Sequence, residues 1–189
     1  MKSDKIQSTE ESLAIITRMI EQTQGNLRSS SFHFILWGMI ATLGFLGQYY
    51  LMEFTSYAHP YIIWLIAIPG WIISFVYGKR SSQHRGVSNY SDKIVMWTWV
   101  AFGFTILVVI FSGRFNELIP PVIMLLSAMA TFITGSIIRF KPLLYGAGAL
   151  WIFSAVALAV SPGNSLLVAA LAFVAGYLIP GFILRSEKS

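Results

Sequence analysis

Six long apolar stretches, separated by short polar breaks, take up most of this 189-residue chain. A helix needs about 20 mostly apolar residues to cross a bilayer, and about 17 suffice where flanking side chains reach the interface. None of the six stretches contains Asp, Glu, Lys or Arg. The pattern therefore predicts an all-α integral membrane protein, with six transmembrane helices in one domain over residues 32–184. The predicted spans are 32–52, 61–77, 94–111, 120–138, 143–160 and 166–184.

The polar segment before the first span, residues 1–31, has helical periodicity. Ser8 and Glu11 have the spacing of a capping box, which satisfies free amides at the start of a helix. Apolar residues then recur at steps of three and four, which predicts a short amphipathic helix. Its apolar face is a candidate partner-binding surface, or it packs on the loops of its own bundle, or it lies among the lipid headgroups. That face consists of Leu13, Ile16, Ile20 and Leu27.

Basic residues are distributed unevenly over the breaks between the spans. Of the 13 Lys and Arg residues, only Arg114 falls on the opposite side from all the others. Because basic residues near span ends are retained in the cytoplasm, this asymmetry predicts a cytoplasmic segment at 1–31 and a cytoplasmic tail at 185–189. The net charge of +5 is then a signature of topology, and no nucleic-acid partner is expected.

The odd-numbered spans have similar sequences near their cytoplasmic ends. These are Leu36-Trp37-Gly38, Met96-Trp97-Thr98-Trp99 and Leu144-Tyr145-Gly146. The likeness predicts three consecutive helical hairpins related by a repeat. It is also explained by the aromatic belts that any helical bundle places at its two membrane interfaces.

Small residues recur within the last three spans at intervals that suit helix packing. Ser127, Thr131 and Gly135 are four apart in the fourth span, and Ala172 and Gly176 have the same spacing in the sixth. Such residues let helix backbones approach closely, which is a main source of association between helices in lipid. We expect a compact bundle with the fourth, fifth and sixth spans at its centre.

Polar side chains are scarce inside the predicted spans. Because ion-driven transport usually needs an ionisable residue at membrane depth, a pump is not predicted. Hydroxyl and amide groups can line an uncoupled passage, or they hydrogen-bond to a helix backbone. A Pro-Gly pair either kinks a helix or frees backbone groups for a ligand. The candidate pore or pocket consists of Gln48, Pro69, Gly70, Thr98, Thr105, Ser127 and Thr131.

The sequence offers little for catalysis or metal binding. It has no cysteine, and His33, His59 and His84 lie in three separate segments. It contains neither the zinc motif HExxH nor a Gly-x-Ser-x-Gly nucleophile turn. Asp4 and Asp92 are the only aspartates, too few for a metal-dependent lipid phosphatase or transferase. We therefore expect no catalytic residue, no metal site and no cofactor.

Several short motifs mark the first quarter of the chain. They are Glu11-Ser12-Leu13, Ile15-Ile16, Met19-Ile20, Ser30-Ser31-Phe32 and Leu36-Trp37-Gly38. This opening resembles that of an uncharacterised family of small bacterial multi-pass inner-membrane proteins with an N-terminal amphipathic helix. The resemblance implies a location in the bacterial cytoplasmic membrane, and it transfers neither a function nor a site residue.

These features predict a non-enzymatic polytopic membrane protein that acts as a scaffold or regulatory subunit of a membrane complex. The expected partners are membrane lipids and either another protein or a second copy of the chain. A binding role is expected because the N-terminal helix is the only extramembrane element with a recognisable pattern. The alternative is a small channel or uncoupled transporter, since passage without coupling requires no charge inside the membrane.

Overall fold

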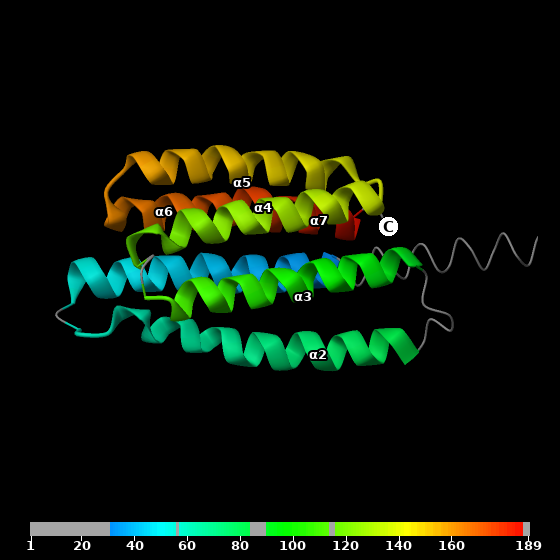
Figure 1. Ribbon diagram of the computed structural model, residues 1–189, viewed down its shortest axis with the longest axis horizontal. Coiled ribbons are helices and arrows are strands. Elements are labelled where there is room, and N and C mark those ends of the chain that lie inside the picture. The colour runs from blue at the N-terminus through cyan, green and yellow to red at the C-terminus, as the bar shows by residue number, and fades with distance from the viewer. Residues whose placement is uncertain (1–30, 56, 84–89, 114–115, 187–189) are drawn as a thin grey trace, which may run out of the picture.

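The computed structural model describes residues 31–55, 57–83, 90–113 and 116–186 of the chain. Within these residues all regular secondary structure is helical, and there is no strand. Six helices are long and apolar enough to cross a membrane, which confirms the predicted number. They lie side by side in an elongated bundle and alternate in direction (Figure 1).

The helices have bounds close to the predicted spans. The first helix covers Ser31–Phe54. The second span joins a 3-10 helix, η1 (Pro60–Ile66), to α2 (Ala67–Gln83). The next two spans are α3 (Tyr90–Phe111) and α4 (Ile119–Ile137), with the short η2 (Asn116–Leu118) between them. The fifth is α5 (Lys141–Ala159). The sixth consists of α6 (Pro162–Phe173), a π-helix named η3 (Val174–Leu178) and α7 (Ile179–Ser186).

Prolines in the first turns explain why the fifth and sixth spans begin earlier than predicted. The predicted spans begin after Pro142 and Pro162, at 143 and 166, but Pro142 is the second residue of α5 and Pro162 is the first residue of α6. Proline suits this position, because the first amides of a helix have no partner within the helix and its fixed φ already matches helical geometry. Gly163 and Asn164, which precede the predicted sixth span, therefore belong to the first turn of α6.

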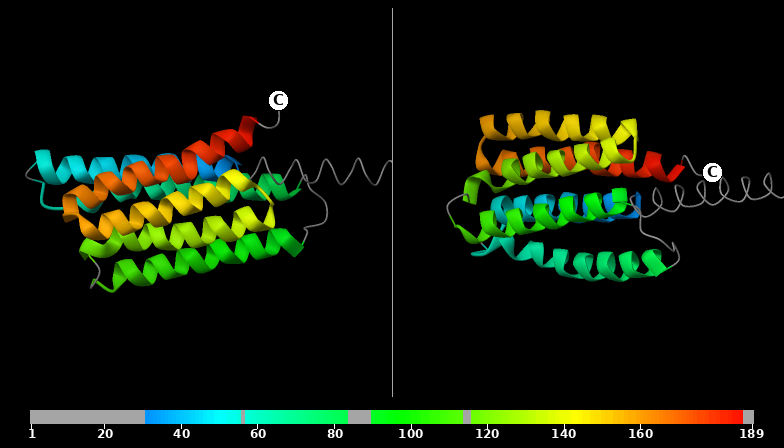
Figure 2. Two further views of the ribbon diagram at one scale, coloured as in Figure 1. Left: turned by 90° about the horizontal axis from the view of Figure 1, so that it is seen from above. Right: turned by 45° about the vertical axis from the view of Figure 1, so that its right-hand side comes forward.

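The bundle has a packed part and a peripheral part. Helices α5 and α2 lie at opposite edges (Figure 1), and the other spans lie between them (Figure 2). The buried share of the apolar window is 50% for α4 and for the sixth span, 33% for α5 and 28% for the first helix. It falls to 6% for the second span and 0% for α3. The last three spans and the first helix therefore form the packed part, although α5 lies at its edge and not at the expected centre.

One end of the bundle collects the basic residues. The C-terminal ends of α2, α4 and α7 and the N-terminal ends of α3 and α5 lie together at this end (Figure 1). The basic residues at these helix ends are Lys79, Arg80, Lys93, Arg139, Lys141 and Arg185. The arrangement fits the predicted alternation of sides, while the assignment of this end to the cytoplasm remains a prediction.

A close backbone contact in the core joins α5 to the sixth span. A Cβ built on Gly146 would lie 2.6 Å from the carbonyl oxygen of Gly176 and 2.8 Å from Cγ of Pro180. A Cβ built on Gly176 would lie 2.6 Å from Cγ of Leu150. Only glycine leaves room for backbones this close, as the small-residue pattern predicted.

Candidate functional site

The candidate pore residue Gln48 takes part in a contact between helices. Its side-chain oxygen accepts a hydrogen bond of 2.7 Å from the indole nitrogen of Trp64 in η1. The Trp64 ring also packs edge-on against Phe45, with 4.8 Å between the ring centroids. Gln48 therefore links the first helix to the second span, and this bond accounts for a polar amide in an otherwise apolar region.

The Pro-Gly pair of the second span lies near the start of α2. Pro69 is exposed on the surface of the bundle, within the first turn of α2. Gly70 is buried, and the position of its missing side chain is filled by Ile40 of the first helix. The pair therefore provides a close contact between two helices, and its proline faces outward.

The candidate hydroxyl residues of the third span donate hydrogen bonds to backbone carbonyl groups of their own helix. Thr98 donates to the carbonyl oxygen of Ile94 at 2.9 Å, and Thr105 donates to that of Ala101 at 2.8 Å. Thr105 is exposed and Thr98 is partly exposed. Such back-bonding lets a hydroxyl remain in an apolar environment without a partner on another helix.

The two remaining candidates, Ser127 and Thr131, meet at the centre of the bundle. Both are buried, one turn apart on α4. The side chain of Tyr177, in η3, interacts with both of them and is 2% exposed. The Tyr177 hydroxyl lies within hydrogen-bonding reach of the Thr131 and Ser127 hydroxyls. We call Ser127, Thr131 and Tyr177 the hydroxyl cluster.

Three other buried hydroxyls bond to a backbone carbonyl, whereas those of Thr42 and Ser165 have no partner among the described residues. Ser154 of α5 donates to the carbonyl oxygen of Pro121 in α4 at 2.9 Å. Thr134 donates to the carbonyl oxygen of Ala130 at 2.8 Å, and Ser31 donates to that of Gly181 at 2.9 Å. The hydroxyl cluster is distinguished from these by joining three hydroxyls of two spans in the core, and we treat it as a candidate site.

Aromatic rings enclose Tyr177 from three other elements. The ring centroid of Tyr177 lies 5.2 Å from that of Phe34 in the first helix and 6.3 Å from that of Trp99 in α3. Phe173 of α6 contributes a third edge-on ring at 5.0 Å. The hydroxyl cluster is thus lined by an apolar wall and lies where the core meets the peripheral α3.

Pro180 explains why the sixth span changes to a π-helix beside this cluster. A proline inside a helix has no amide, and its ring collides with the carbonyl group four residues before it, here that of Gly176. The helix accommodates this by widening, and the amide of Ile179 donates to the carbonyl oxygen of Val174, five residues back. Tyr177 belongs to the widened turn, and such turns often occur at functional sites.

Tyr177 was absent from the residues that the sequence singled out. Two features could have drawn attention to it. It falls in the middle of the predicted span 166–184, away from the interfaces where tyrosines usually collect, and it precedes Pro180 by one turn. Only the fold shows that it faces Ser127 and Thr131, because that contact joins the fourth and sixth spans.

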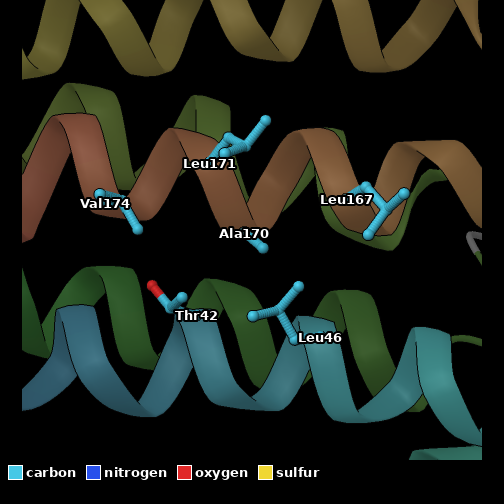
Figure 3. A pocket seen from close by; sticks show the side chains of 6 residues that line it. All are labelled: Thr42, Leu46, Leu167, Ala170, Leu171 and Val174. Atoms are coloured by element: carbon cyan, nitrogen blue, oxygen red, sulfur yellow. The ribbon is translucent and has the colours of Figure 1, made fainter.

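A shallow apolar groove lies between the first helix and α6, with a volume of about 250 Å³ (Figure 3). Thr42 is the one polar residue among its lining residues, and the figure shows its hydroxyl directed toward α6. The volume is below the roughly 300–1,000 Å³ of ordinary small-molecule sites, and the groove is open on one side. The groove is therefore smaller than an ordinary ligand site.

The candidate partner-binding face of Leu13, Ile16, Ile20 and Leu27 lies outside the described residues. Among the residues that the structure describes, no three His, Cys, Asp or Glu side chains are grouped as a metal site would require.

Comparisons with known proteins find no similarity: no family model, no curated protein and no solved structure matches the chain. The resemblance of the opening segment to a bacterial inner-membrane family therefore remains a prediction.

Proposed function

We propose that this chain is a non-enzymatic integral membrane protein that serves as a scaffold or regulatory subunit of a membrane complex in a bacterial cytoplasmic membrane. The observation that supports the proposal is the division of the bundle into a packed core and a peripheral pair of spans. The second span and α3 bury almost nothing within their own chain. Two of the six spans are therefore free to pack against another membrane protein.

The peripheral spans attach to the core through a few aromatic contacts. The indole nitrogen of Trp37 donates to the hydroxyl of Ser74 in α2 at 3.0 Å, and its ring packs against Trp71. On α3, Trp99 packs edge-on against Phe34, with ring centroids 5.9 Å apart. These contacts fix one side of each span and leave the other sides exposed.

The exposed sides of α2 and α3 carry large apolar side chains. Phe75, Phe104 and Val108 are 65%, 68% and 70% exposed, whereas the core at Gly146 and Gly176 is built from small residues. Within a membrane, such a surface is covered either by lipid or by the helices of another protein. We propose that this surface is the intramembrane part of the partner contact, and that the predicted N-terminal helix is the cytoplasmic part.

The first test replaces the apolar face of the predicted N-terminal helix in the full chain. We expect Leu13→Asn, Ile16→Asn and Ile20→Asn together to abolish recovery of the partner after affinity purification from native membranes. The bundle itself should still insert, because the three positions precede the first span. Partner recovery is measured by mass spectrometry, and insertion by extraction with detergent and elution as a folded species.

The matched control changes the polar face of the same predicted helix by the substitutions Arg18→Asn, Glu21→Asn and Gln22→Asn. These alter the helix to a similar extent but leave the apolar face intact, so partner recovery should persist. Equal recovery with both triple variants would contradict a role for the apolar face in partner binding.

A small uncoupled transporter is the second candidate, and the hydroxyl cluster favours it because it places polar groups near the middle of two packed spans. In proteoliposomes, glycerol and urea serve as neutral probes, followed by light scattering during osmotic reswelling. We expect Thr131→Leu to abolish protein-dependent reswelling, because it removes a cluster hydroxyl and fills its space. Thr105→Leu, on the exposed side of α3, is the control and should not change it. Identical rates with and without the wild-type protein would contradict transport of these solutes.

A further inference from the structure

The turn between α4 and α5 places two exposed cations on either side of a buried ring. Arg139 and Lys141 are exposed, whereas Phe140 between them is only 6% exposed. Because the ring of Phe140 packs into the core, it fixes the turn at the end of the bundle. Neither cationic side chain forms a hydrogen bond or an ion pair with any residue that the structure describes. Both charges are therefore available to a ligand outside the chain.

The backbone of this turn is strained at the arginine. The amide of Phe140 donates to the carbonyl oxygen of Gly135 at 3.0 Å, and the amide of Arg139 donates to that of Ser136 at 3.4 Å. These two bonds form a Schellman motif, whose left-handed position is usually occupied by glycine. Here Arg139 occupies it, with a φ of 54°. Backbone strain of this kind is concentrated at functional sites, so the arginine side chain calls for an explanation.

Membrane topology alone does not explain the positions of the two cations. The positive-inside preference depends on the number of basic residues near the span ends and requires no particular position. A glycine at position 139 would end α4 without strain. Lys141 is the first residue of α5, where the positive end of the helix dipole disfavours a cation. Two cations at locally unfavourable positions indicate that an anion meets them there.

The surroundings of the turn suit a phospholipid headgroup. Tyr145 lies one turn after Lys141 on α5 and is 75% exposed. An exposed tyrosine at a span end has its ring against acyl chains and its hydroxyl among the headgroups. Of the three acidic residues that the structure describes, only Asp92 lies at this end of the bundle, and it belongs to α3 (Figure 1). The turn thus combines positive charge with an interfacial aromatic ring.

We propose that Arg139, Lys141 and Tyr145 bind the phosphate group of an anionic phospholipid. A guanidinium group can donate two parallel hydrogen bonds to a phosphate, and the ammonium group adds a second positive charge. A zwitterionic lipid would bind less well, because its own ammonium group is repelled by the two cations. The acyl chains would lie along the exposed side of α5, which carries Ile152 one further pair of turns along. The site rests on the proposed membrane location but not on the scaffold role, because a scaffold and a transporter could bind the lipid equally.

Thermal unfolding in mixed micelles of detergent and lipid tests the proposal. A ligand that binds only the folded state raises the unfolding midpoint. We expect phosphatidylglycerol to raise the midpoint of the wild-type protein more than phosphatidylcholine does, and the variant carrying Arg139→Gly and Lys141→Gln to lose this difference. Because glycine suits the positive φ, the variant should keep the wild-type midpoint in phosphatidylcholine, so that a lost lipid effect is not a loss of folding.

A pair of single lysine variants separates the site from the general charge of this end. Lys79 is also exposed, but it lies on α2 at the opposite edge of the bundle, with its Nζ 4.5 Å from the centroid of the Phe75 ring. We expect Lys141→Gln to remove at least half of the difference between the two lipids and Lys79→Gln to leave it unchanged.

Three outcomes would overturn the proposal. The first is an equal effect of the two lipids on the wild-type protein. The second is an equal loss in the two lysine variants, which would mean that the lipid responds to net charge alone. The third is equal stabilisation by soluble glycerol phosphate in phosphatidylcholine micelles, which would make a free phosphate compound and not a lipid the ligand.

Discussion

A Gly146→Ala variant is expected to be less stable than the wild-type protein, while Gly148→Ala on the same helix is expected to be at least as stable. The added methyl at position 146 would meet the carbonyl oxygen of Gly176 at 2.6 Å and the ring of Pro180 at 2.8 Å. Neither neighbour is a flexible side chain that can move aside. Overpacking of a core costs about 1–3 kcal/mol, and we expect a loss in that range.

The control at position 148 separates packing from the general effect of replacing glycine. A Cβ built on Gly148 meets nothing within 4 Å. Alanine is more favourable than glycine inside a helix by about 1 kcal/mol, and this gain applies equally at both positions. Reversible unfolding in mixed detergent micelles measures both variants. Equal stability of the two would show that α5 and the sixth span are not in close contact.

The six spans could be predicted from sequence because the membrane imposes a simple rule of length and polarity. Gly146 and Gly176 were also identifiable as packing residues, since small side chains in a span indicate close approach. The starts of α5 and α6 near Pro142 and Pro162 were harder to predict, because proline is common both in turns and in first helical turns. Local sequence does not distinguish these two uses.

The candidate site was predicted only in part. The sequence placed Gln48, Thr98 and Ser127 in a single group because each is a polar residue within a span. The fold separates them, since Gln48 bonds to Trp64 and Thr98 bonds to its own helix. Ser127 alone of these three contacts Tyr177. A sequence shows which residues carry hydroxyl groups. Which hydroxyl groups come together depends on how the spans pack, and this is known only from the fold.

Pro180 connects the packing of the core to the hydroxyl cluster. Its missing amide accounts for the π-helix, and the π-helix contains both Tyr177 and the glycine that meets Gly146. A change at Gly146 should therefore disturb Tyr177 as well as overall stability. Additivity fails between residues that share a contact, so Gly146→Ala combined with Tyr177→Phe should deviate from the sum of the single changes.

The second large effect is expected at Leu150, which lies on α5 and is 0% exposed. Its Cγ would lie 2.6 Å from a Cβ built on Gly176, so it fills the space beside the π-helix. Leu150→Ala leaves a cavity there. In water-soluble cores this substitution costs about 2–5 kcal/mol, a sum of transfer and cavity contributions.

In a membrane the transfer contribution is largely lost, because lipid tails are as apolar as leucine and the unfolded helices remain in lipid. Only the lost packing contacts remain, so we expect Leu150→Ala to cost roughly 1–3 kcal/mol, below the soluble range. Leu158→Ala is the matched control on the same helix. Leu158 is 56% exposed, and lipid can refill the space, so its replacement should have little effect on stability. Similar losses for the two variants in bicelles would mean that Leu150 has no special place in the core, which would contradict the observed packing of α5 on the π-helix.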